Sequence, residues 1–188
     1  MKNDAIINSI LCLLTAYKKM NSTNSNKMNK ASLRYLLGQS IRQYDIPLSN
    51  RHVSKEARSR WDEISKSNIE DYHYRNVVVC DNLKVPKQYL LFNGANGSGE
   101  PTKLMPGSTF IFREMFHEDH VIPVSLILRE MIEMVNVNRI EIKNLLDKMH
   151  LCVLLKEEDR KIGRTKGRTL HYNQNIINIY NKAGISIL

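Results

Sequence analysis

Cysteine is scarce in this sequence and never closely paired. The 188 residues include three cysteines, Cys12, Cys80 and Cys152, which lie far apart and form no Cys-x-x-Cys motif. A cysteine-ligated zinc site needs such close pairs, and a small secreted fold held by disulfide bonds needs more cysteines. The sequence therefore excludes both classes, and we expect a protein of a reducing compartment.

Long apolar runs are also lacking. A transmembrane helix needs about 20 predominantly apolar residues, and the nearest approach is AIINSILCLLTAY at residues 5–17. Asp4 precedes this run and no small-residue cleavage site follows it, which is unlike a secretion signal. We interpret the run as a buried amphipathic helix and expect a cytoplasmic protein with no membrane partner.

A phosphate-binding nucleotide loop is not present either. The glycine-rich stretch GANGSGEPTKLMPGS begins with Gly94 and Gly99 at the spacing of that motif, but Glu100 and Pro101 stand where it requires lysine and a hydroxyl residue. We expect a loop here and no nucleotide cofactor.

Basic residues, by contrast, are in excess and unevenly distributed. The net charge is +9, with a net +6 in residues 1–70, −1 in residues 71–149 and +4 in residues 150–188. Basic flanks that hold phosphates around a central acidic metal site would give this pattern, and so would ordinary solvated lysines. The charge alone gives only a moderate indication of an anionic partner.

Hydrophobic periodicity predicts an α+β fold with helices concentrated in the N-terminal half. We expect helices near residues 4–17, 31–44, 53–65, 124–135, 138–149, 156–163 and 173–184, and strands near 75–83, 87–94, 108–120 and 150–155. In the helix at 53–65, Ser54 is the expected N-cap and Trp61 the expected core anchor. The single boundary that we expect lies after residue 75, between a helical, basic region at residues 1–75 and an α+β region at residues 76–188.

Four consecutive polar residues, His117 to His120, precede an apolar stretch that contains Pro123. All four are metal-ligand or acid/base types. In an extended strand, His117 and Asp119 would share one face and Glu118 and His120 the other. Such a cluster suits metal-assisted phosphodiester hydrolysis, although polar residues at strand ends are also common surface features.

The segment DHVIP and the later segment LLKEEDRKI together resemble the ββα-metal unit of the HNH endonucleases. In that family one strand delivers Asp-His, a proline follows, and a helix after a second strand completes the metal site. Asp119, His120 and Pro123 match the first part, and Asp159, with Glu158 as the alternative, matches the helix position. The resemblance covers residues 110–165 and implies that the helices expected at 124–149 are an insertion between the two strands.

The resemblance implies roles for these residues. His120 would be the general base, while Asp119 and Asp159 would bind one divalent ion, with His117 and Glu118 as supports. Because the implied protein ligands are all oxygens, Mg²⁺ or Mn²⁺ is the expected ion. Asn144 and His150 are further candidates whose roles the sequence leaves open.

Basic side chains near this unit are candidates for binding the DNA backbone. We assign this role to residues of the GRTKGRTLHY stretch and of the helix at 53–65, namely Arg164, Lys166, Arg168, Arg58 and Arg60. The C-terminal YNKAGI also resembles stand-alone HNH proteins of restriction systems.

The sequence therefore leads to the hypothesis of a metal-dependent HNH endonuclease that cuts double-stranded DNA, as a homodimeric type II restriction enzyme. A symmetric dimer would match a palindromic site. Residues 1–75 would then serve DNA recognition or dimerisation, and residues 76–188 would be the nuclease region. The alternatives are a non-catalytic DNA-binding or regulatory protein, and a nuclease toxin that acts on DNA or RNA.

Overall fold

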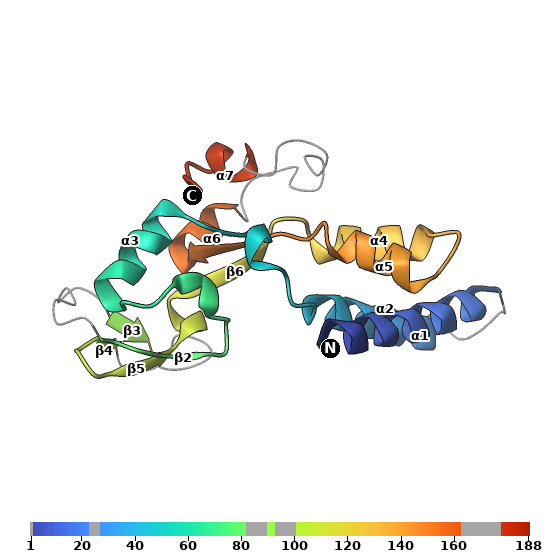
Figure 1. Ribbon diagram of the computed structural model, residues 1–188, viewed down its shortest axis with the longest axis horizontal. Helices are drawn as coiled ribbons and strands as arrows, with labels where there is room; N and C mark the ends of the chain where they lie inside the picture. Colours follow the sequence, from blue (N-terminus) through green and yellow to red (C-terminus); the bar gives the residue numbers. More distant parts are fainter. Residues whose placement is uncertain (1, 23–26, 82–89, 93–100, 163–177) are drawn as a thin grey trace. The chain divides into compact units, whose positions relative to one another are not determined.

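The computed structural model describes residues 2–22, 27–81, 90–92, 101–162 and 178–188 (Figure 1). Helices and short strands are mixed along this part of the chain, which confirms the predicted α+β class. No helix among the described residues has the length and apolar character that crossing a membrane would require.

The chain divides into two compact units. We call residues Met1–Asn50 and His120–His150 the helical unit, and residues Arg51–Asp119 and Leu151–Leu188 the sheet unit. This division differs from the single boundary after residue 75 that the sequence suggested, because residues 120–150 return to pack with the N-terminal helices.

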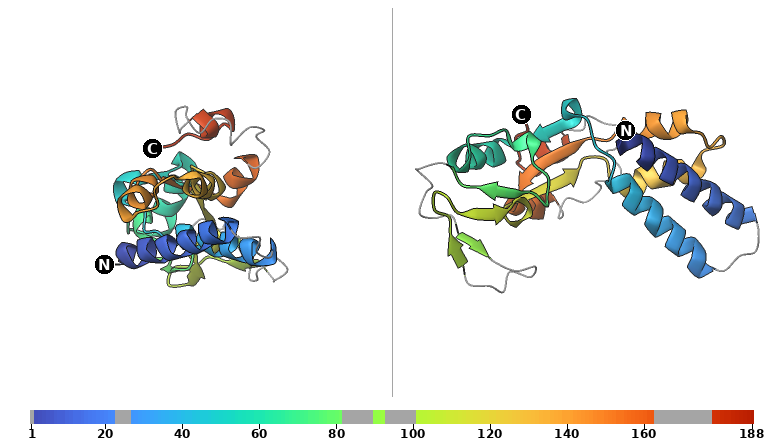
Figure 2. Two further views of the ribbon diagram at one scale, coloured as in Figure 1. Left: turned by 90° about the vertical axis from the view of Figure 1, so that its right-hand side faces the viewer. Right: turned by 60° about the horizontal axis from the view of Figure 1, so that its bottom comes forward.

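The helical unit contains α1 (Lys2–Ser22), α2 (Lys27–Arg42), the 3₁₀ turn η1 (Leu48–Asn50), α4 (Val124–Glu133) and α5 (Arg139–Leu146). Helix α1 packs against α2, α4 and α5, and α4 also packs against α2 and α5. Figure 2 shows α1 and α2 lying alongside each other. Residues Ile7, Ile10 and Leu14 of α1 are buried at helical spacing, as expected for an amphipathic helix that faces a core.

The sheet unit is built on three strands in the order β1-β7-β6. Their bounds are Arg51–Val53 for β1, Leu151–Leu155 for β7 and Phe116–His120 for β6. Strands β1 and β7 are parallel. Strands β6 and β7 are antiparallel, since the amide of Val121 donates to the carbonyl of His150 while, at the other end, the amide of Lys156 donates to the carbonyl of Met115.

The sheet unit contains further helices and strands besides this sheet. Helices α3 (Lys55–Ile64) and α6 (Lys156–Ile162) pack against β7. Two antiparallel pairs join β2 (Val77–Val79) to β5 (Thr109–Ile111) and β3 (Leu90–Phe92) to β4 (Pro101–Lys103). Short turns η2 (Ile69–Asp71) and η3 (Phe112–Glu114) and the helix α7 (Asn178–Lys182) complete it.

An aromatic cluster forms the core of the sheet unit. Trp61 is fully buried and its ring contacts Tyr72, Phe112 and Phe116 at centroid distances of 4.7, 5.9 and 5.6 Å. Ser54 caps α3 by accepting a hydrogen bond from the amide of Ala57. The predicted N-cap and core anchor of this helix are therefore confirmed.

Candidate metal centre

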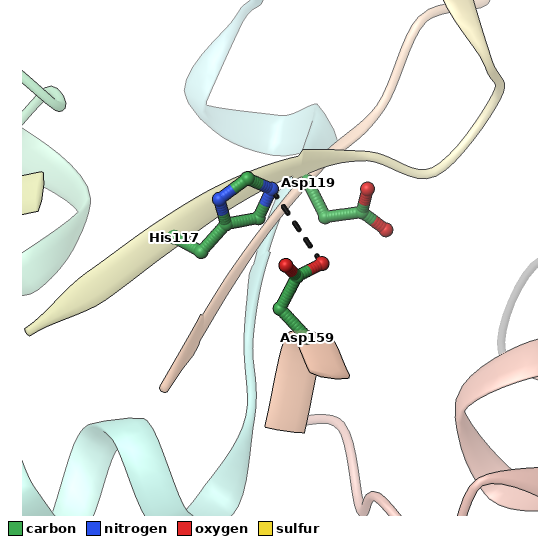
Figure 3. Close-up of side chains that lie close together, drawn as sticks. All are labelled: His117, Asp119 and Asp159. Atoms are coloured by element: carbon green, nitrogen blue, oxygen red, sulfur yellow. Dashed lines mark ion pairs between the residues drawn. The ribbon is translucent and has the colours of Figure 1, made fainter. Parts of the chain in front are cut away.

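Two side chains of β6 and one of α6 converge at one edge of the sheet unit. His117, Asp119 and Asp159 each offer a ligand atom, and these three atoms lie within 4.8 Å of one another (Figure 3). The Nε2 atom of His117 is 3.6 Å from Oδ1 of Asp159. This is a donor set of two carboxylates and one imidazole.

The fold explains why these residues meet although β6 ends at His120 and α6 begins only at Lys156. Side chains two apart on a strand share a face, which brings His117 and Asp119 together. Strand β7 runs antiparallel beside β6, so its end lies next to the start of β6, where the amide of Lys156 bonds to Met115 at 3.2 Å. Helix α6 begins at this point, and Asp159 therefore faces β6 from the first turn of the helix.

Burial differs sharply within the group. Asp119 is 5% exposed, whereas the side chains of His117 and Asp159 are 45% and 36% exposed. A buried carboxylate requires hydrogen-bond partners, and the hydroxyl of Tyr180 in α7 donates to Oδ2 of Asp119 at 2.9 Å. The group thus has a buried, hydrogen-bonded member and two members open to solvent, where a ligand has access.

Glu158, the alternative metal ligand from the sequence, has a different position. It is buried, and its Oε2 accepts hydrogen bonds from the hydroxyl of Ser54 at 2.6 Å and from the amide of Leu155 at 2.9 Å. The second bond is half of a capping box, in which an acidic residue in the first turn reaches back to the amide at the helix start. Glu158 therefore fixes the start of α6 to α3, and Asp159 is the residue that lies with Asp119.

His120 is the last residue of β6 and is half-buried. It is not a member of the three-residue group, which contains His117 instead. Strand alternation accounts for this difference, because His120 and Asp119 are neighbours on opposite faces. The resemblance gave His120 the principal role and His117 only a supporting one. The two-residue spacing in the sequence nevertheless indicated that His117 and Asp119 share a face.

Glu118 supports β6 from the other side. Its carboxylate accepts a hydrogen bond from the amide of Tyr74 at 3.0 Å and lies 3.2 Å from Nδ1 of His73. Arg51 of β1 in turn lies 3.3 Å from Nε2 of His73. These contacts tie the segment around residues 73–74 to the strand that carries the candidate ligands, and sequence reasoning did not identify either His73 or Arg51.

Cys152 lies in β7, the strand that pairs with β6. Burial raises the pKa of its thiol, and the negative charges of Asp119 and Glu158 raise it further. A thiol with a raised pKa stays protonated at neutral pH, and the thiolate is the form that binds metals. The oxygen and imidazole donors are therefore the chemically suited ligands in this part of the protein.

The predicted DNA-binding residues have mixed positions. Arg164, Lys166 and Arg168 lie outside the described residues. On α3, Arg58 forms an ion pair with Glu70, and Arg60 is half-buried. Asn144 is exposed on α5, and the carbonyl of His150 accepts the hydrogen bond from Val121.

Comparisons with protein-family models, with curated proteins and with solved structures found no match to this chain.

Proposed function

We propose that this protein is a metal-dependent endonuclease of the HNH type that hydrolyses phosphodiester bonds of double-stranded DNA. The observation that carries the proposal is the convergence of His117, Asp119 and Asp159 where an antiparallel strand pair leads into α6. The order of strand, helical insertion, strand and helix agrees with the arrangement that the sequence resemblance implied.

The donor set fits a single divalent ion. Oxygen ligands lie about 2.0–2.6 Å from Mg²⁺ or Ca²⁺, so two atoms bound to one ion are separated by about 3 to 5 Å. The three candidate ligand atoms already lie within 4.8 Å of one another. Carboxylates suit Mg²⁺ and Mn²⁺, and the imidazole of His117 shifts the preference toward Mn²⁺ because nitrogen ligands favour transition metals.

The residues then take distinct roles. Asp119, Asp159 and His117 hold the ion, which supplies charge stabilisation for the phosphate and its leaving oxygen when bound. His120, which follows Asp119 in the chain, is the proposed general base that accepts a proton from the attacking water.

The proposed substrate and assembly follow from charge and symmetry. A net charge of +9 favours a polyanion, and the basic stretch with Arg164, Lys166 and Arg168 would contact the phosphate backbone together with Arg60 and, if its ion pair opens, Arg58. A homodimeric, cytoplasmic type II restriction enzyme is the form of the proposal that accounts for double-strand cleavage.

The test is plasmid cleavage by the purified protein with Mg²⁺ or Mn²⁺, compared with EDTA and with Asp119→Asn. We expect metal-dependent nicking or linearisation by the wild type and none by the variant. Salt-sensitive DNA binding with no cleavage under any metal would instead favour a non-catalytic binding protein. Cleavage of RNA in place of DNA would favour a nuclease toxin.

A further inference from the structure

Tyr180 connects the C-terminal helix to the candidate metal centre. The residue is 2% exposed, and its hydroxyl donates a hydrogen bond of 2.9 Å to Oδ2 of Asp119, which is itself buried. The two residues are 61 positions apart in the chain. The contact therefore depends on where α7 is held.

Several backbone hydrogen bonds hold α7 in place. Gly184 adopts a φ of 73°, the left-handed conformation that commonly ends a helix, and the amide of Ile185 bonds back to the carbonyl of Tyr180. The chain then pairs with the end of β1, where Ser186 accepts from Lys55 and Leu188 donates to Val53. The segment that carries Tyr180 is thus fixed to the same sheet unit as Asp119.

A phenol hydrogen bond has a defined effect on a buried carboxylate. It offsets part of the desolvation cost of the charge and restricts rotation of the carboxylate plane. Carboxylates that bind metals are commonly held by such partners, and loss of one partner typically weakens metal affinity about 10- to 100-fold. His117 and Asp159 are much more exposed than Asp119, so Asp119 is the member whose orientation the protein interior controls.

We propose that Tyr180 is a positioning residue of the metal centre. Its hydrogen bond orients the carboxylate of Asp119 toward His117 and Asp159. This inference rests on the proposed function. It goes beyond it by assigning to the C-terminal helix a role in setting metal affinity, whereas the sequence offered only a weak resemblance for YNKAGI.

The experiment is a Mn²⁺ titration of the full chain, followed by electron paramagnetic resonance, for the wild type and Tyr180→Phe. A matched control is available in the helical unit. There the hydroxyl of the buried Tyr44 donates to Oδ1 of Asp147 at 2.6 Å, and neither residue belongs to the candidate centre. Tyr44→Phe removes a comparable Tyr–Asp hydrogen bond.

We expect Tyr180→Phe to weaken Mn²⁺ binding about 10-fold or more and Tyr44→Phe to leave it unchanged. In an Asp119→Asn background, Tyr180→Phe should have no further effect. Equal Mn²⁺ affinity for wild type and Tyr180→Phe would overturn the inference while leaving the proposed function intact. If the wild type bound no Mn²⁺, or bound it equally well after Asp119→Asn, both the inference about Tyr180 and the proposed function would be overturned.

A second measurement needs no variant at position 180. In wild-type protein with isotope-labelled tyrosine rings, addition of Mg²⁺ should shift the Tyr180 resonance and leave that of Tyr44 in place. An unshifted Tyr180 resonance in protein that binds Mg²⁺ would contradict the inference even if Tyr180→Phe failed to fold.

Discussion

Ser54 and Glu158, 104 residues apart, share a buried hydrogen bond of 2.6 Å between a hydroxyl and a carboxylate. Ser54 caps α3 and Glu158 caps α6. This contact therefore joins the starts of two helices that pack against β7, and one of those helices carries the candidate ligand Asp159.

Two adjacent carboxylates on α6 should consequently have different roles, with Glu158 affecting stability and Asp159 affecting metal binding. Glu158→Ala leaves the hydroxyl of Ser54 and the amide of Leu155 without this acceptor, and should lower the free energy of unfolding by roughly 1–3 kcal/mol. Asp159→Ala should have a small effect on stability and abolish tight Mn²⁺ binding. Urea denaturation and Mn²⁺ titration of both variants measure this. The assignment of Asp159 fails if the two variants show the reverse pattern.

His117 and His120 should differ in the step that each supports. His117→Ala removes a candidate ligand and should weaken Mn²⁺ binding, with part of the cleavage activity restored by excess metal. His120→Ala should leave Mn²⁺ affinity close to that of the wild type and reduce the cleavage rate about 100-fold or more, the usual contribution of a general base.

These outcomes are read from metal titrations and single-turnover cleavage of a plasmid. A His120→Ala protein with wild-type cleavage would remove His120 from the proposed mechanism. If His117→Ala were the variant that lost catalysis at saturating metal, the proton transfer would belong to His117.

The three cysteines should react at very different rates. Cys12 is exposed, whereas Cys80 and Cys152 are buried and burial raises the pKa of both thiols. Since the thiolate is the reactive form, iodoacetamide at neutral pH should modify the native protein once, and Cys12→Ser should remove that fast modification. Mass spectrometry counts the additions, and unfolded protein should take three. Rapid labelling of Cys152 in native protein would contradict its described position.

Stability should fall in mild acid because of His52 in β1. Burial lowers the pKa of His52 below its usual value, so the folded state disfavours the proton that the unfolded chain accepts below about pH 6.5. The contribution of neutral His52 to the free energy of unfolding is therefore present above that pH and is lost as the pH falls through the lowered pKa. Denaturation midpoints from pH 7.5 to 5 should decline less in His52→Gln than in the wild type. Parallel declines would show that other groups carry the effect.

Local signals in the sequence predicted the parts of the structure that depend on neighbouring residues. A serine before a helical pattern identified the cap at Ser54, and strand alternation identified the shared face of His117 and Asp119. Asp159 was predicted as a ligand from the segment LLKEEDRKI, in which a strand leads directly into a helix. Such features are encoded within about ten residues.

The support of the site depends on contacts that no local pattern encodes. Tyr180 reaches Asp119 across 61 residues, and Ser54 engages Glu158 only because the sheet places β1 beside β7. Helices α4 and α5 have ordinary amphipathic patterns. Such patterns do not indicate whether a helix packs with residues that precede it or with residues that follow it. The sequence therefore could not predict that the helical unit is built from two separate segments of the chain.

The insertion between β6 and β7 also has a kinetic consequence. Closing a chain loop costs entropy that grows slowly with its length, and α4 and α5, which pack on each other, shorten the effective loop between the two strands. Helical hairpins form faster than pairings between distant strands. Strands β6 and β7 should thus pair after α4 and α5 have met. Because this pairing brings α6 with Asp159 to the ligands on β6, assembly of the centre should be a late event in folding.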